Sequence, residues 1–175
     1  SRVQALHDVH FPPSAAALNA AIRRLKFEEL FVIQLQLLGQ RRVRTERIRG
    51  YAMPKIGGYF NMFYREKLPF SLTGAQQRVV KEIRGDMVGG HQMNRLMQGD
   101  VGSGKTIVAL LCILIAADNG FQSALMAPTE ILATQHYRSI LELVETTGLR
   151  VELLTGSTGR RKRAEIAEGL MSGEI

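Results

Sequence analysis

The sequence predicts an α/β fold, in which a partial parallel sheet with flanking helices follows a long helix and a basic linker. Two observations predict it. Residues 68–175 alternate short apolar runs with longer helical ones, as parallel strands joined by helices do. Residues 15–49 instead carry apolar side chains at intervals of three to five residues, the pattern of a long amphipathic helix. We therefore expect two domains, a helical connector with a basic linker at 1–67 and an α/β domain at 68–175.

The connector is expected to contain one helix between two irregular segments. Residues 1–14 include two consecutive prolines and predict an irregular lead-in, and Ser14 is a suitable cap for the helix after it. Gly39 is expected to interrupt this helix. Residues 50–69 contain several Gly and Pro residues and lack periodicity, which predicts a loop or linker.

Residues 68–175 are expected to contain three strands, each followed by a helix, after an initial helix. Thr73 is a suitable cap for that first helix, which should end near Met87. The predicted strands are 94–98, 122–127 and 150–154. The predicted helices that follow them are 107–117, 130–146 and 159–171. In an open parallel sheet, ligands bind at the carboxyl ends of the strands, so the loops after these strands are the candidate sites.

Charge is distributed unevenly along the chain. The net charge is +7, and residues 1–67, with twelve basic and five acidic side chains, account for all of it. A basic segment favours nucleic acid as a partner, although a solvated helix face would carry the same residues. With 45% hydrophobic and 22% charged residues, the composition is typical of a soluble globular protein. No apolar run approaches the roughly 18 residues of a membrane span.

The single cysteine, Cys112, lies in an apolar helical run. It is expected to fill the core rather than to react, and one cysteine excludes a disulfide within the chain, which favours a reducing compartment. The sequence begins without Met and lacks a secretory signal, so we expect it to be a piece of a larger chain.

Residues 99–106 match the phosphate-binding loop pattern G-x-x-x-x-G-K-[ST] in full. Glycines allow positive φ angles there and let backbone N–H groups approach phosphate. Lys105 is expected to bind the β- and γ-phosphates and Thr106 to hold Mg²⁺ through its hydroxyl, which makes these two the candidate catalytic residues. The nucleotide-binding candidates in the loop are Gly99, Asp100, Val101, Gly102, Ser103, Gly104, Lys105 and Thr106. The alternatives are a Gly-rich turn with an unrelated lysine, or the loop of another nucleotide hydrolase or kinase.

Two further loops follow predicted strands, at residues 127–130 and 155–158. Both contain hydroxyl side chains and precede helix N-termini, where free N–H groups suit the phosphate oxygens of a nucleic acid backbone. The same residue types also serve as helix caps and turns. Neither loop decides between these two roles by itself.

The order of these motifs closely resembles that of the bacterial RecG family of branched-DNA helicases, which belong to superfamily 2. The matching segments are Leu72-Thr73-Gly74-Ala75-Gln76, the loop from Gln98 to Thr106, residues 126–133 and 154–157, and also His10-Phe11-Pro12 and residues 24–31. The resemblance covers nearly the whole chain. It implies that residues 68–175 are the N-terminal part of the first RecA-like motor lobe.

The resemblance also implies roles for single residues. Gln76 is expected to recognise the adenine of ATP, and Phe70 either stacks on the same base or packs in the core. The residues expected to contact the DNA backbone are Pro128, Thr129, Thr155 and Gly156. The basic run at 160–163 either extends this DNA-contacting surface or begins a solvated helix.

As a whole, the resemblance implies an ATP-dependent DNA helicase, with ATP and Mg²⁺ as cofactors, that remodels branched or fork DNA in recombination and repair. Such a protein would act as a monomer without a membrane segment, in the bacterial cytoplasm at the nucleoid. No Asp is followed by Glu in this sequence, so the Walker B carboxylates that anchor Mg²⁺ and orient water are absent. We expect the chain to end before that motif and to bind nucleotide at most. The non-enzymatic alternative is a basic DNA-binding connector, with its DNA contacts in residues 41–67.

Overall fold

The computed structural model describes residues 1–68 and 70–175, apart from the side chains of residues 44, 45 and 47. The side chains of Arg44 and Arg47, two of the basic residues of the connector, and Pro69, the last residue of the predicted linker, therefore lie outside the described residues. The chain divides into two compact units, residues 1–49 and residues 50–175.

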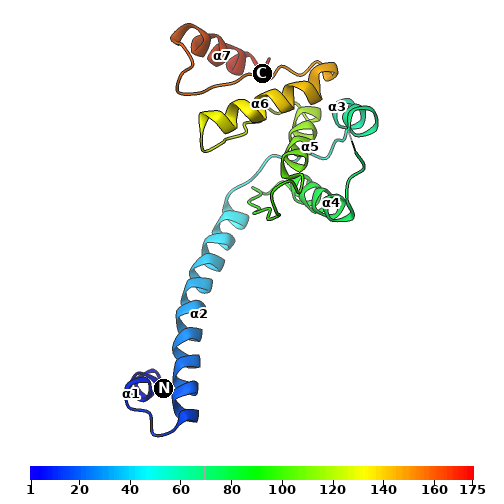
Figure 1. Cartoon of the computed structure of the whole chain (residues 1–175). Helices are drawn as coiled ribbons and strands as arrows, with labels where there is room; N and C mark the ends of the chain where they lie inside the picture. Colours follow the sequence, from blue (N-terminus) through cyan, green and yellow to red (C-terminus); the bar gives the residue numbers. More distant parts are fainter. Residues whose placement is uncertain (69) are drawn as a thin grey trace. The chain divides into compact units, whose positions relative to one another are not determined.

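The first unit is a pair of packed helices, α1 (Arg2–His10) and α2 (Ala15–Arg47) (Figure 1). Ser14 caps α2 as predicted, because its hydroxyl accepts a hydrogen bond from the backbone N–H of Ala17 at 3.2 Å. The prediction of an irregular lead-in is wrong for α1, whose first turn is capped by the hydroxyl of Ser1. The predicted break at Gly39 is also wrong. A single glycine costs a helix only about 1 kcal/mol, which the rest of this long helix outweighs.

Residues 50–67, predicted to be a loop, are a packed part of the second unit. They contain α3 (Gly58–Met62) and a π-helical turn, η1 (Phe63–Lys67). Phe63 is fully buried in the main core of this unit. The start of the segment is tied to the end of α4 (Gly74–Val88) by a backbone hydrogen bond from the N–H of Met53 to the carbonyl of Met87 at 2.8 Å. The functional division at residues 67 and 68 stays a prediction.

Asp118 is the buried polar residue that fixes this segment. It is the last residue of α5 (Lys105–Asp118) and is 8% exposed. Its carboxylate accepts backbone hydrogen bonds from Gly57, Tyr59 and Phe60 at 2.8, 3.0 and 3.1 Å. No side chain of α3 caps its own first turn. A residue that is distant in sequence therefore supplies the cap, and no local pattern could have predicted it.

The remaining helices begin and end close to where the sequence predicts them. They are α4 (Gly74–Val88), α5 (Lys105–Asp118), α6 (Glu130–Val144) with the 3-10 turn η2 (Glu145–Thr147), and α7 (Arg160–Ser172). Thr73 caps α4 as predicted, and it forms a reciprocal capping box with Gln76. The helix α5 is the centre of the unit, and α3 and α4 both pack against it (Figure 1).

The core of the second unit is built around α5. The fully buried side chains of this helix include Leu110, Leu111, Leu114 and Ile115. Residues from η1 and α6, together with Leu72 just before α4, complete the larger cluster. Cys112 lies partly buried beside the smaller cluster, and burial raises the pKa of its thiol to about 11, which agrees with the predicted packing role.

The predicted parallel sheet is not formed, so the predicted α/β fold class is wrong for this structure. In the part of the chain that the structure describes, 94–98, 122–127 and 150–154 are not strands, and regular structure is helical. A strand exists through backbone hydrogen bonds to a neighbour, and none joins these three segments among the described residues. Several of their apolar side chains stay exposed, such as Leu96 at 84% and Met126 at 92%, whereas Met97 and Val151 pack against the core from segments that form no sheet. Strand propensity requires a partly buried sheet surface, and these runs lack one.

Candidate nucleotide and nucleic-acid site

The phosphate-binding loop leads directly into α5, as its motif predicts. Gly102 and Gly104 have φ angles of +79° and +81°, in the left-handed region that residues other than glycine rarely adopt. Gly104 is also the first flanking residue of α5, and no side chain caps the helix there. The N–H groups of the first turn are therefore not occupied by a capping side chain, and with the helix dipole they favour an anion.

Lys105 closes the loop on itself. Its ammonium group donates hydrogen bonds to the backbone carbonyls of Gly99 and Asp100, at 2.8 and 2.7 Å. The same loop is narrowed by a backbone hydrogen bond from Ser103 to the carbonyl of Asp100 at 3.1 Å. The lysine is thus held over the loop by neutral carbonyl acceptors. A phosphate oxygen would be a charged acceptor and would form a stronger hydrogen bond with it.

Gln76 joins α4 to this loop. Its side-chain oxygen accepts a hydrogen bond from the backbone N–H of Thr73 at 2.8 Å, and its side-chain nitrogen donates to the carbonyl of Ser103 at 2.9 Å. An amide side chain has two donors and can accept two hydrogen bonds, so one donor and one acceptor remain. A Cβ on Gly104 would lie 2.4 Å from the Gln76 nitrogen and would displace that side chain, and the φ of +81° is the stronger reason for glycine at this position.

Thr106 lies in the first turn of α5, beside Lys105. Val101 is fully exposed at the tip of the loop. Among the described residues, no group of three or more His, Cys, Asp or Glu residues is placed to hold a metal ion. The structure therefore places Gln76 beside the loop at 99–106, so that all the predicted nucleotide-binding residues lie together.

Phe70, offered as a core residue or as a base-stacking one, is 47% exposed. It lines a shallow hollow with Ser71 and Gln77 rather than packing in the core. This exposure excludes the prediction that Phe70 is a core residue.

The two hydroxyl-containing loops lie beside each other, although each also caps or shapes its own backbone. Thr129 caps α6 by accepting a hydrogen bond from the N–H of Leu132 at 3.3 Å. Thr155 and Thr158 close the second loop, because the N–H of Thr155 donates to the hydroxyl of Thr158 at 2.8 Å. Pro128 is exposed, and nothing lies within 4 Å of a Cβ added to Gly156. Pro128, Thr129 and Gly156 are thus exposed and Thr155 is partly buried, and the DNA contacts of all four stay a prediction.

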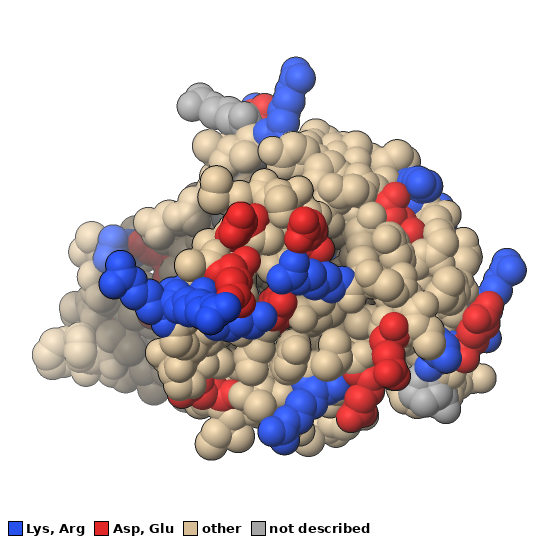
Figure 2. Space-filling model, turned by 90° about the horizontal axis from the view of Figure 1, so that it is seen from above, with Lys and Arg blue, Asp and Glu red and all other residues tan. Residues whose placement is uncertain are grey.

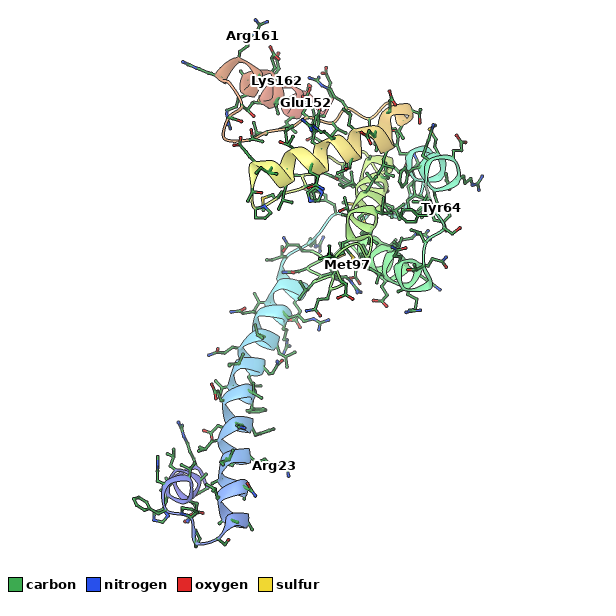
Figure 3. All side chains as sticks on the ribbon, viewed as in Figure 1. Arg23, Tyr64, Met97, Glu152, Arg161 and Lys162 are labelled. Atoms are coloured by element: carbon green, nitrogen blue, oxygen red, sulfur yellow. The ribbon has the colours of Figure 1, made fainter. Side chains whose placement is uncertain are left out.

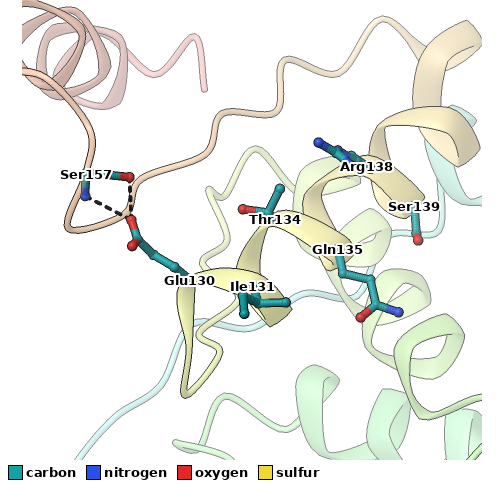
Figure 4. Close-up of a pocket in the computed structure, with 7 residues that line it drawn as sticks. All are labelled: Glu130, Ile131, Thr134, Gln135, Arg138, Ser139 and Ser157. Carbon is teal, nitrogen blue, oxygen red and sulfur yellow. Dashed lines mark hydrogen bonds between the residues drawn. The ribbon is translucent and has the colours of Figure 1, made fainter.

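Glu130 connects the two loops, a contact that the sequence did not predict. Its carboxylate accepts hydrogen bonds from the backbone N–H of Ser157, at 2.9 Å, and from the Ser157 hydroxyl (Figure 4). Hydrogen bonding by the Ser157 hydroxyl, then by the Thr155 side chain and the Ser157 N–H, lowers the pKa of Glu130 from 4.5 to about 2. The acidic residue directly after the Thr129 cap was the available signal, but nothing in the sequence indicated its partner.

Most basic side chains at the start of α7 form ion pairs or hydrogen bonds within the protein. Lys162 forms an ion pair with Glu152 at 2.9 Å, and Arg161 pairs with Glu165 at 3.2 Å (Figure 3). Arg163 donates to the carbonyl of Thr155 at 2.8 Å. Figure 2 shows basic and acidic groups side by side on the face viewed there, rather than a continuous basic surface. These pairs favour a structural role for most of the run.

Comparison with known proteins identifies the relatives of this chain. Residues 73–172 match the family model described as DEAD/DEAH box helicase. The ATP-dependent DNA helicase RecG of Synechocystis is 47% identical over 98% of this chain, and that of Thermotoga maritima is 45% identical over 98%. A solved structure of RecG bound to a three-way DNA junction superposes with a TM-score of 0.86 at 46% identity, covering 98% of this chain and 23% of that one.

The resemblance to RecG helicases is therefore confirmed. The chain spans 20% and 22% of the length of the two named relatives.

Proposed function

The chain belongs to the DEAD/DEAH box helicase family, and we propose on that premise that it is the nucleotide-binding part of an ATP-dependent DNA helicase that acts on branched DNA. The carrying observation is the assembled loop, in which Gln76, Lys105 and the glycines meet at the start of α5. The proposed reaction of the whole protein is ATP hydrolysis coupled to remodelling of junction or fork DNA in recombination and repair.

The loop fits a nucleoside triphosphate in shape and in charge. Nothing lies within 4 Å of a Cβ added to Gly102, so the backbone of the loop is open there to an approaching phosphate. Lys105 would exchange its two carbonyl acceptors for phosphate oxygens. Mg²⁺ bound with the nucleotide neutralises phosphate charge, and Thr106 is the hydroxyl ligand that this chain would offer it.

Adenine would be recognised through the remaining hydrogen-bonding capacity of Gln76. One amide N–H and one acceptor position stay available after its bonds to Thr73 and Ser103. An acceptor ring nitrogen and an exocyclic amine match this pair, whereas guanine offers an oxygen where the amine should be. The same side chain would therefore sense the base and support the phosphate loop.

DNA is proposed to lie along the two loops joined by Glu130. Thr129 and Thr155 offer hydroxyl groups, and Gly156 offers a backbone without a side chain in the way. Pro128 would shape the first of these loops. We further propose a protein that acts as a monomer in the bacterial cytoplasm, at the nucleoid. In the described residues, no helix combines the length and hydrophobicity needed to cross a membrane.

This chain by itself is proposed to bind nucleotide without turning it over. Hydrolysis in this class of enzyme needs carboxylates that hold Mg²⁺ and orient water, and no Asp-Glu pair occurs in the 175 residues. Turnover by the isolated chain, abolished by Lys105→Ala, would overturn this part of the proposal.

The experiment that tests the proposed function uses the natural protein at its full length. Junction-stimulated ATP hydrolysis and unwinding of a labelled three-way DNA junction are measured for the wild type and two variants. Lys105→Ala should abolish both activities and leave junction binding intact. Thr155→Ala should weaken junction binding about tenfold, as expected for one charge-assisted hydrogen bond, and leave nucleotide binding unchanged.

Thr146→Ala is the matched control for the threonine, because Thr146 is an exposed residue of η2 outside both loops. It should bind the junction like the wild type. A wild-type protein that neither hydrolyses ATP nor binds the junction would refute the proposed function.

A further inference from the structure

The loop at 155–158 already holds an anion, and that anion is a side chain of the protein. Both hydrogen bonds that Ser157 directs out of the loop, from its N–H and from its hydroxyl, end on one oxygen of Glu130. A backbone N–H combined with a serine hydroxyl is a donor pair suited to a phosphate oxygen. The carboxylate therefore sits where a phosphate of the proposed DNA strand would bind.

Glu130 is not needed to give the loop its shape. The loop is closed by its own bonds, from the Thr155 N–H to the Thr158 hydroxyl at 2.8 Å and from the Thr158 N–H to the Thr155 carbonyl at 3.3 Å. The guanidinium of Arg163 donates a further hydrogen bond to the Thr155 carbonyl, at 2.8 Å. Since these bonds fix the backbone of the loop, the hydrogen bonds to Glu130 satisfy the Ser157 N–H and hydroxyl and are not needed to form the turn.

The carboxylate also lies at the edge of an open cavity that could receive a strand. The cavity has a volume of about 580 Å³ and is lined by α6 and by Ser157 (Figure 4). Thr134 and Gln135 provide polar groups on its wall, and Arg138 provides a cation. Among the described residues, no ion pair or hydrogen bond joins Arg138 to another side chain. The cavity is therefore lined by the Glu130 carboxylate at one end and by the Arg138 guanidinium on its wall.

We propose that Glu130 is an internal substitute for phosphate, which occupies the donors of Ser157 until a DNA phosphate displaces it toward the cavity. This inference rests on the proposed function, because it assumes that the loop at 155–158 contacts DNA. It adds a regulatory step to that contact: DNA must compete with a carboxylate of the protein. Because any phosphate must first displace this carboxylate, the loop should bind a single isolated phosphate more weakly than it would without Glu130.

The test is a comparison of junction affinities in the natural protein at its full length, without nucleotide. Glu130→Gln removes the charge and keeps the size of the side chain, so it should bind a labelled three-way DNA junction about three- to fivefold more tightly, the range of an exposed charge interaction. Glu142→Gln removes the same charge from the same helix outside the cavity. It should change the affinity less than about twofold.

Ser157→Ala tests the other half of the contact. It should weaken junction binding, and Glu130→Gln added to it should bring a smaller gain than in the wild type, because only the Ser157 N–H remains for carboxylate and phosphate to compete for. Equal thermal unfolding midpoints for all variants show that folding is unchanged.

Three results overturn the inference. Weaker binding by Glu130→Gln would mean that the carboxylate orders the loop for DNA, and a gain equal to that of Glu142→Gln would mean a general charge effect. In both cases the proposed function stands. A wild-type protein that does not bind the junction overturns the inference together with the proposed function.

Discussion

The side-chain nitrogen of Gln76 donates a hydrogen bond to the backbone carbonyl of Ser103 at 2.9 Å, which ties the first turn of α4 to the phosphate-binding loop. The same side chain completes the capping box of α4 with Thr73. One residue thus stabilises a helix end, supports the loop and retains hydrogen-bonding capacity for a base. Nucleotide affinity and local stability should therefore change together when it is altered.

Gln76→Ala is expected to lower the free energy of unfolding by about 1 kcal/mol, because half of the capping box is lost. It should also reduce the preference of the chain for ATP over GTP. Urea unfolding and nucleotide titration measure the two effects. Gln77→Ala removes a neighbouring amide that donates to the Leu72 carbonyl, at 3.0 Å, and should leave base preference unchanged. An unchanged base preference in Gln76→Ala would exclude Gln76 from base recognition.

Two glycine substitutions are expected to have opposite effects on stability. Gly104→Ala forces a side chain into a φ of +81° and against the Gln76 nitrogen, so it should destabilise the unit by about 1–2 kcal/mol and abolish nucleotide binding. Gly85→Ala lies within α4 with nothing within 4 Å of the new Cβ. It should stabilise by about 0.5–1 kcal/mol. Thermal unfolding checks both signs, and equal shifts would contradict the requirement for glycine at the start of α5.

Asp118→Ala should be among the most destabilising single substitutions in residues 50–175. It leaves three backbone N–H groups of the α3 segment without their acceptor, at a cost of about 3 kcal/mol or more. Asp118→Asn keeps one acceptor oxygen and should cost less. The control is Glu168→Ala, an exposed carboxylate of α7, which should stay within about 0.5 kcal/mol of the wild type in urea unfolding. A loss of similar size in both alanine variants would contradict the capping role.

Glu130 is expected to titrate far below an ordinary glutamate. Because hydrogen bonds from Ser157 lower its pKa to about 2 in the folded protein, its contribution to stability is complete above the unfolded pKa of 4.5 and is lost as the pH falls toward 2. Carbon-13 NMR of the side-chain carboxyl measures this directly. Ser157→Ala should move the pKa of Glu130 up toward 4.5. A pKa near 4.5 in the wild type would mean that the two loops are not joined in solution.

The helices could be predicted from the sequence because their signals are local. Thr73 precedes Gln76 by three residues, and this spacing alone specifies the capping box that begins α4. The phosphate-binding loop is local in the same way, since its glycines and Lys105 lie within eight consecutive residues. Both the loop and the helix after it formed where the sequence predicted them.

The errors concern partners that are distant in sequence. Asp118 organises residues 57–60 through backbone contacts, so Gly and Pro in that segment indicated a loop where the structure has a packed helix. The runs that include Leu96 and Met126 have the composition of strands, but a ladder depends on a neighbour and not on composition. The bond between Glu130 and Ser157 was missed for the same reason.

The loop from Gly99 to Thr106, together with Gln76, is proposed to form an adenine nucleotide site, and the rest of the proposed function depends on it. The most direct measurement is calorimetric titration of the 175-residue chain with ATP and GTP in the presence of Mg²⁺, for the wild type, Lys105→Ala and the control Lys81→Ala, an exposed lysine of α4. We predict that the wild type and Lys81→Ala bind ATP in preference to GTP and that Lys105→Ala binds neither. Equal affinity for the two nucleotides, or ATP binding that survives Lys105→Ala, would contradict the proposed site.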